Sequence, residues 1–145
     1  MGLESLLEFV RQNFYLILPA VASGAALLYF TFFAPEKKLS LTPTQATLLI
    51  NRESAQIIDL RSPGEYAEGH IPDSRNIPLD QFDARIDDLE KYKESPVILV
   101  CKRGGDASKT SLRLAKKGFT RAHYVEGGVL AWTDDGLFLK KGSKR

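Results

Sequence analysis

Between Phe14 and Pro35 the sequence carries no charged residue. As an α-helix this stretch would be roughly 33 Å long, enough to cross a hydrocarbon core of about 30 Å. Aromatic residues gather at both of its ends, a pattern that is typical of the two interfaces of a membrane. The sequence therefore predicts a transmembrane helix over residues 14–35, preceded by a short N-terminal segment, residues 1–13.

Three other interpretations compete with a spanning helix. A buried helix of a soluble core is rarely this long without a charge. A cleaved signal peptide favours a basic beginning, whereas Glu4 and Glu8 outnumber Arg11 here, and apolar sequence continues beyond the small residues 20–22. An amphipathic helix on a membrane surface needs a polar face, which residues 14–35 lack. The spanning helix agrees best with the pattern.

The charges on either side of this stretch predict its orientation. Lys37 and Lys38 follow it, and only Arg11 precedes it closely. The positive-inside rule then places the C-terminal part of the chain in the cytoplasm. The chain has a single cysteine, so no intrachain disulfide is possible, and a free thiol persists best in a reducing compartment. Both observations favour a cytoplasmic domain.

Downstream of the apolar stretch, short strand patterns alternate with helix patterns. Thr42, Pro43 and Gln45 form a capping box that predicts the start of a helix. Strands are expected over residues 56–59, 96–100 and 122–125, and a short helical turn from Ser62 to Tyr66. Such alternation is typical of a parallel sheet that is covered by helices on both faces.

Two longer helices are expected between these strands. The first covers residues 80–92, with Phe82, Ile86 and Leu89 on one face at steps of four and three. The second covers residues 106–117 and ends at Gly118. Its inward-facing residues are expected to be Leu112, Leu114 and Ala115.

The chain thus divides into the N-terminal segment and the span already given, a linker at 36–41, one α/β domain at 42–138 and a basic tail at 139–145. The formal net charge of +2 is too small to indicate a nucleic-acid partner.

The segment that most clearly indicates a functional site follows the predicted strand 96–100. Cys101 comes at the strand end, Gly104 and Gly105 lie in the loop, and a helix follows. Ligands of open parallel sheets bind beyond the carboxyl ends of the strands, and a loop that leads into a helix N-terminus binds anions. Such a site favours the thiolate form of a cysteine. Spacing alone leaves open whether Cys101 is a nucleophile or a buried structural residue.

A set of short motifs around this cysteine resembles the rhodanese-like family. The set runs in order over about residues 39–138. Its members are Asp59-Leu60-Arg61, Glu65-Tyr66, Gly69-His70-Ile71-Pro72, Asn76-Ile77-Pro78, Cys101 with its loop, Lys117-Gly118-Phe119, Glu126-Gly127-Gly128 and Ala131-Trp132. With the preceding span, the whole is similar to the bacterial membrane-bound, single-domain rhodanese proteins of the YibN type. The resemblance implies an α/β sandwich around a five-stranded parallel sheet, at the bacterial inner membrane.

The resemblance also implies roles for particular residues. Cys101 matches the cysteine that carries sulfur as a persulfide. The residues of the following loop match those whose amides surround the sulfur, and they are the expected substrate-binding residues: Lys102, Arg103, Gly104, Gly105, Asp106 and Ala107. The expected activity is sulfur transfer from a thiosulfate or persulfide donor to a thiol acceptor, with no metal and no cofactor. The lipid bilayer is a further expected partner, and a membrane protein is another candidate partner.

Other polar residues of the set are interpreted as structural. Asp59, Arg61 and Glu65 are expected to form a scaffold ion pair, because charged residues beside a buried strand normally pair. His70 belongs to the Gly-His-Ile turn of the family. His123 and Trp132 are expected to be packing residues.

One residue departs from the family pattern. Single-domain rhodaneses commonly carry Arg at the fifth position after the cysteine, where this chain has Asp106. A carboxylate that faces the pocket would repel thiosulfate, whereas one that points outward would favour the helix N-terminus.

Two functions besides sulfur transfer are consistent with the sequence. One is a non-catalytic docking module tethered to the membrane. The other is a phosphatase of the same fold, which would need an arginine where this chain has Ala107.

Overall fold

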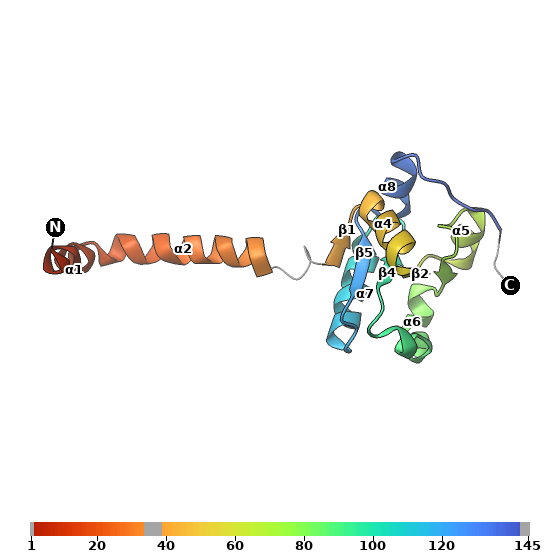
Figure 1. The fold of residues 1–145 in the computed structure, drawn as a ribbon, viewed down its shortest axis with the longest axis horizontal. Helices are drawn as coiled ribbons and strands as arrows, with labels where there is room; N and C mark the ends of the chain where they lie inside the picture. The colour runs from red at the N-terminus through yellow and green to blue at the C-terminus, as the bar shows by residue number, and fades with distance from the viewer. Residues whose placement is uncertain (1, 34–38, 143–145) are drawn as a thin grey trace. The chain divides into compact units, whose positions relative to one another are not determined.

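The computed structural model describes residues 2–33 and 39–142. The chain divides into two compact units, Met1–Ala34 and Pro35–Arg145 (Figure 1). The first unit holds two helices, α1 (Leu3–Gln12) and α2 (Phe14–Phe33). The second unit holds a sheet with its covering helices. Lys37 and Lys38, which carry the orientation argument, lie outside the described residues.

Helix α2 coincides with the apolar stretch of the sequence. Among the described residues it alone is long and apolar enough to cross a membrane, with a mean hydropathy of 1.9 and no buried residue. This confirms one candidate transmembrane helix near the N-terminus. Helix α1 was not predicted, since residues 3–12 were expected only as part of a short N-terminal segment.

The second unit is built on five parallel strands in the order β1-β5-β4-β2-β3. They are β1 (Ser40–Leu41), β2 (Gln56–Asp59), β3 (Arg75–Asn76), β4 (Val97–Val100) and β5 (Ala122–Val125). All four residues of β4 are fully buried, as expected of a central strand that is covered on both faces. The expected five-stranded parallel sheet is confirmed.

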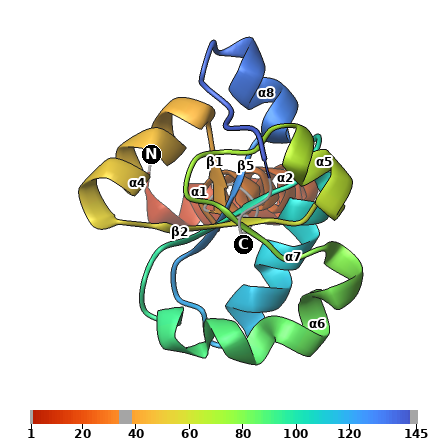
Figure 2. The ribbon, with the colours of Figure 1, turned by 90° about the vertical axis from the view of Figure 1, so that its right-hand side faces the viewer.

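Helices cover both faces of this sheet (Figure 2). On one face α4 (Pro43–Glu53) and α8 (Gly128–Asp134) pack over a cluster that includes Ile57, Ile98 and Trp132. On the other face α6 (Phe82–Arg85) and α7 (Gly105–Lys116) pack over a cluster that includes Ile58, Leu99 and Phe82. Because side chains alternate along a strand, adjacent residues such as Ile57 and Ile58 enter opposite clusters.

Local sequence signals place the helix starts. Thr42 caps α4 with the predicted capping box: its hydroxyl accepts from the Gln45 N–H, and the Gln45 side chain accepts from the Thr42 N–H. Ser62 caps α5 (Pro63–Glu68) with its hydroxyl, which accepts from the Glu65 N–H. Pro follows the cap in both helices, where its missing N–H costs nothing.

The single helix expected over residues 80–92 is wrong. Two 3₁₀ segments, η1 (Leu79–Gln81) and η2 (Ile86–Tyr92), flank the short α6. The backbone leaves regular helix at Arg85, with φ of −110° and ψ of 7°. Phe82 and Leu89 are nevertheless both fully buried in one cluster. In a 3₁₀ segment residues three apart lie on one side, which aligns Ile86 with Leu89.

The inward face of α7 also differs from the expectation. Leu114 is buried as predicted, but Ala115 is exposed and Leu112 is only half-buried. The buried positions are Ala107, Thr110, Ser111 and Leu114, which follow helical spacing. The hydroxyls of Thr110 and Ser111 donate to backbone carbonyls of their own helix, at 2.8 and 2.7 Å. These hydrogen bonds satisfy the buried hydroxyl groups, so the two polar side chains can face the core.

Chain segments at both ends of the domain are more ordered than expected. Ser40–Leu41, within the expected linker, form β1 beside β5. Lys140, within the expected tail, exchanges backbone hydrogen bonds with His70, and the Gly142 N–H donates to the Ala67 carbonyl. Residues 143–145 of that tail lie outside the described residues.

Candidate functional site

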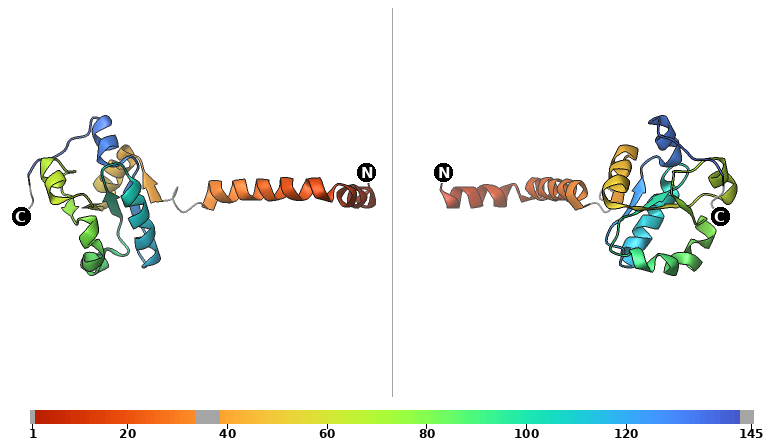
Figure 3. Two further views of the ribbon diagram at one scale, coloured as in Figure 1. Left: turned by 180° about the vertical axis from the view of Figure 1, so that it is seen from behind. Right: turned by 45° about the vertical axis from the view of Figure 1, so that its right-hand side comes forward.

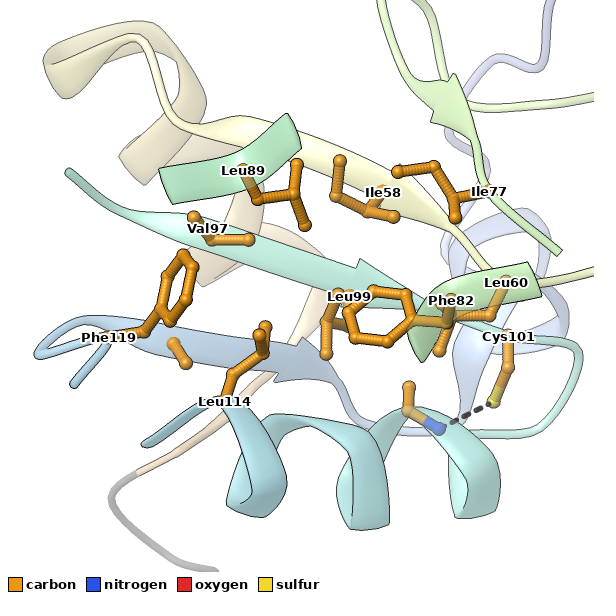
Figure 4. Close-up of a cluster of buried hydrophobic side chains, with 12 residues drawn as sticks. Ile58, Leu60, Ile77, Phe82, Leu89, Val97, Leu99, Cys101, Leu114 and Phe119 are labelled. Atoms are coloured by element: carbon orange, nitrogen blue, oxygen red, sulfur yellow. Dashed lines mark hydrogen bonds between the residues drawn. The ribbon is translucent and has the colours of Figure 1, made fainter. Parts of the chain in front are cut away.

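Cys101 immediately follows the central strand β4, at the carboxyl edge of the sheet. Figure 4 shows its side chain at the end of the buried cluster, near Leu60 and Phe82. Only 6% of the residue is exposed. The strand therefore delivers the thiol to the ligand-binding edge of the sheet, with one side packed against apolar side chains.

The Cys101 sulfur accepts hydrogen bonds from two backbone amides. The Gly104 N–H donates to Sγ at 2.9 Å and the Ala107 N–H at 3.5 Å. Both donors belong to the first turn of α7 or its N-cap, where amides have no partner within the helix. An anionic sulfur gains from both hydrogen bonds and from the positive end of the helix.

The loop reaches this geometry because Gly104 adopts a left-handed conformation, with φ of +101°. A side chain there would be strained, and its Cβ would lie 3.0 Å from the Gly127 nitrogen. Gly104 thus permits both the turn that aims its N–H at the sulfur and the close approach of the segment before α8.

Helix α8 holds the cysteine loop from the other side. The Val129 N–H donates to the Cys101 carbonyl at 2.9 Å, and the Leu130 N–H donates to the Lys102 carbonyl at 3.2 Å. Gly128 lies so close that a Cβ there would be 2.3 Å from the Cys101 carbonyl oxygen. The Gly127-Gly128 pair therefore brings α8 onto the loop.

Four of the six loop residues predicted to bind substrate are exposed to solvent. Lys102, Arg103, Gly105 and Asp106 are exposed, whereas Ala107 is fully buried. Of the six predicted residues, only Gly104 and Ala107 donate to the sulfur in the described structure, and both do so through the backbone. Asp106 lies in the first turn of α7, where a carboxylate favours the helix dipole.

A buried ion pair supports the neighbouring strand end. Asp59 is 1% exposed, and the Arg61 guanidinium binds its carboxylate through Nε and Nη2, the latter at 2.8 Å. Arg61 also donates to the Gly69 carbonyl, while the Asn76 amide donates to the carbonyls of Asp59 and Arg61. The predicted scaffold pair is therefore formed by Asp59 and Arg61, and Glu65 is exposed at the start of α5.

The aromatic and histidine residues of the motif set have packing roles. His70 is 3% exposed, and its ring stacks on Tyr66 with centroids 3.9 Å apart. Its Nδ1 lies 2.9 Å from the Tyr66 carbonyl, so that nitrogen carries the proton. Trp132 is buried and donates to the Phe138 carbonyl, and His123 is half-buried on β5. These positions agree with the structural interpretation of all three residues.

A groove of about 420 Å³ adjoins the cysteine loop. Its lining residues include the apolar Leu130 and Leu139 and the charged Arg61, Glu65 and Lys102. Sequence reasoning missed Leu130, Thr133 and Leu139 as residues next to the site. Leu130 and Thr133 lie in the helix that follows Gly127-Gly128, and this proximity to the glycines was the signal that could have identified them. Nothing in the sequence indicated Leu139.

No group of three or more His, Cys, Asp or Glu residues able to hold a metal ion occurs in residues 2–33 and 39–142.

A five-stranded parallel α/β domain with a cysteine in an amide-lined loop after its central strand agrees with the rhodanese-like motif set of the sequence. The chain belongs to the rhodanese-like family, whose domain model matches residues 42–135. It is 32% identical over 142 residues to the uncharacterized protein YibN of Escherichia coli, an alignment that covers 97% of this chain and 99% of YibN.

Two further relatives show the range of the family. The thiosulfate sulfurtransferase GlpE of Actinobacillus pleuropneumoniae is 33% identical over 97 residues, which cover 67% of this chain and 88% of GlpE. The solved structure of a rhodanese-like domain protein from Staphylococcus aureus superposes with a TM-score of 0.59 at 33% identity, over 72% of this chain and 98% of that one. Some relatives that carry this domain are therefore named sulfurtransferases.

Proposed function

We propose that the chain is a membrane-anchored sulfane-sulfur carrier that forms a persulfide on Cys101. The observation that carries this proposal is the pair of amides, from Gly104 and Ala107, that donate to one cysteine sulfur at 2.9 and 3.5 Å. Neutral structural cysteines need no such donors, because a thiol is only a weak acceptor. An anionic thiolate or persulfide gains much more from them.

The proposed cycle has two balanced steps. In the first, the Cys101 thiolate attacks the sulfane sulfur of a donor, so that an S–S bond forms on Cys101 and the donor leaves with the electron pair of its broken bond. With thiosulfate the leaving group is sulfite. In the second step an acceptor thiolate attacks the outer sulfur, which becomes the acceptor's persulfide, and the Cys101 thiolate returns.

The amides at the site stabilise the negative charge at each stage of the cycle. The charge begins on Sγ and moves to the outer sulfur, which remains beside the N-terminus of α7. Lys102 and Arg103 follow Cys101 directly and favour the approach of an anionic donor. Asp106 opposes them, and thiosulfate is therefore a poorer donor than a less highly charged persulfide of a small thiol.

The anchor in this proposal is α2. Its length, its apolar composition and the absence of buried residues among its side chains support a membrane-spanning role. The balance of Arg11 against Lys37 and Lys38 favours a cytoplasmic domain at the inner membrane of a bacterium. Sulfur would then be delivered at the membrane surface, to a small thiol or to a membrane protein.

A docking module without catalysis is the second candidate function. It is favoured by the 6% exposure of Cys101, which leaves little of the residue accessible to a bulky partner. A phosphatase is disfavoured, because Ala107 is fully buried and supplies no side chain to bind phosphate, while Asp106 would repel it.

Intact mass of the purified chain tests the proposal. The protein is incubated with thiosulfate and, separately, with the persulfide of a small thiol. We expect a gain of one sulfur that is removed by reductant and is absent in the Cys101→Ser variant. No gain from either donor would refute the persulfide and favour the docking module.

A further inference from the structure

The ten residues of α1 divide cleanly into two faces. Leu3, Leu6, Leu7 and Val10 follow helical spacing along one side, and Phe9 extends that side. Glu4, Ser5, Glu8, Arg11 and Gln12 occupy the other. The exposed fractions of the apolar side chains range from 40% for Val10 to 72% for Leu3, and no residue of α1 is buried. Exposure of this apolar face to water is energetically unfavourable, and such faces normally mark a contact with protein or membrane.

The helical conformation is interrupted between α1 and α2. Asn13 leaves the helical conformation, with φ of −111° and ψ of 15°, and its side-chain amide donates to the Phe9 carbonyl at 2.8 Å. Figures 1 and 3 show α1 turned out of the axis of α2, within the same compact unit. Such an interruption allows α2 to span a bilayer while α1 takes a different direction at the bilayer surface.

We propose that α1 lies in the lipid–water interface, with Leu6 and Val10 facing the acyl chains and Glu4 and Glu8 facing water. This inference rests on the proposed membrane anchoring by α2. The covalent link to α2 holds α1 at the bilayer surface, so that its insertion costs little further freedom. Its role is to fix the depth and tilt of the spanning helix.

The charges on the polar face indicate whether α1 needs anionic lipids in order to insert. Amphipathic helices that depend on anionic lipid carry Lys and Arg on this face. In α1 two carboxylates accompany the single Arg11, which lies 3.9 Å from Glu8. Burial of the apolar face therefore drives the insertion, and zwitterionic phosphatidylcholine, which has no net charge, is sufficient.

Cysteine accessibility in nanodiscs tests this placement. The full chain with Cys101→Ser is reconstituted at one copy per phosphatidylcholine nanodisc, which leaves both bilayer faces open to a water-soluble maleimide. Single cysteines are introduced by Leu6→Cys on the apolar face, Ser5→Cys on the polar face and Ala25→Cys within α2. We expect Leu6→Cys to react at least about tenfold more slowly than Ser5→Cys, and denaturant to remove the difference.

The outcomes separate this inference from the anchoring itself. Equal rates at Leu6→Cys and Ser5→Cys, with Ala25→Cys still protected, would overturn the interfacial helix and leave the anchor intact. A rapid reaction at Ala25→Cys would overturn both. A fluorophore on Leu6→Cys should also be quenched by a nitroxide near the lipid headgroups. Protection without quenching would mean that protein covers this face, which would contradict the proposal.

Discussion

Gly128 packs directly against the carbonyl group of Cys101. A Cβ at Gly128 would lie 2.3 Å from the Cys101 carbonyl oxygen, and the backbone there is left-handed, with φ of +62°. The close approach allows the neighbouring Val129 N–H to donate to that carbonyl. The position of the candidate sulfur site therefore depends on a glycine that lies far from it in the sequence.

Replacement of Gly128 by Ala should displace α8 from the cysteine loop. We expect the free energy of unfolding to fall by about 3 kcal/mol, from backbone strain and the clash together. The matched control is Gly136→Ala, which has a similar φ of +75° but open space around it, and should cost only about 1 kcal/mol. Urea unfolding of the full chain in detergent measures both. Equal losses would show that the close contact is unimportant.

Removal of the Arg61 guanidinium should leave the Asp59 carboxylate buried without its ionic partner. We expect Arg61→Ala to lower the free energy of unfolding by about 3 kcal/mol, because an uncompensated buried charge is costly. The control is Arg85→Ala, which removes an exposed partner of Asp88 and should cost less than about 1 kcal/mol. If the two variants were equally stable, the proposed scaffold role would be wrong.

Asp106 should slow the reaction of Cys101 with thiosulfate through charge repulsion. Its carbonyl carbon is bonded to the Ala107 nitrogen that contacts Sγ, so its carboxylate lies within a Debye length of about 10 Å of the sulfur. We expect Asp106→Arg to raise the rate of persulfide formation about tenfold at low salt, with Asp106→Asn intermediate.

Glu94→Arg makes the same charge change before β4, at the opposite end of that strand, and serves as the control. It should leave the rate nearly unchanged. An equal rise in both variants would mean that only net charge matters. No rise in Asp106→Arg would show that the Asp106 carboxylate does not affect the donor.

The Glu53–Arg121 ion pair should make stability depend on pH. The hydrogen bond from Arg121 holds the pKa of the Glu53 carboxyl below its ordinary value, and the same contact raises the pKa of Arg121. A lowered folded-state pKa stabilises the fold above the unfolded-state pKa, and this contribution is lost as the pH falls through the folded-state pKa. We expect Glu53→Gln to be modestly less stable than the unchanged protein at pH 7.

That difference should shrink as the pH falls through the acid range. Urea midpoints from pH 7 down to the acid limit of the folded state measure it. The contribution is small because both side chains are exposed. A difference that stayed constant with pH would mean that the Glu53→Gln substitution acts through packing and not through charge.

Much of the fold follows from local sequence signals. The buried run at Val97–Val100 and the capping box at Thr42 are determined by short-range chemistry, and both appear where they were predicted. The segmented helix between Leu79 and Tyr92 was not predictable in this way. The spacing of Phe82, Ile86 and Leu89 fits one continuous helix, and it carries no signal for the non-helical backbone at Arg85.

The candidate site shows a similar division. The position of Cys101 after a buried strand, with a glycine loop behind it, was readable from the sequence. Which amides reach the sulfur was not, because that depends on the conformation of Gly104 and on the pitch of α7. Thr110 and Ser111 were not expected in the core because their side chains are polar. Their hydroxyls can be buried because they donate to carbonyls of their own helix, and the sequence does not reveal those hydrogen bonds.

Transfer of labelled sulfur from Cys101 to an acceptor thiol tests whether the chain is a sulfur carrier. The full chain is loaded with a donor whose outer sulfur is isotopically labelled, freed of excess donor and mixed with a small thiol. We expect the label to leave the protein and to appear in the acceptor's persulfide, with one sulfur transferred per Cys101. A chain that never takes up the label, or that keeps it in the presence of excess thiol, would contradict a sulfur carrier.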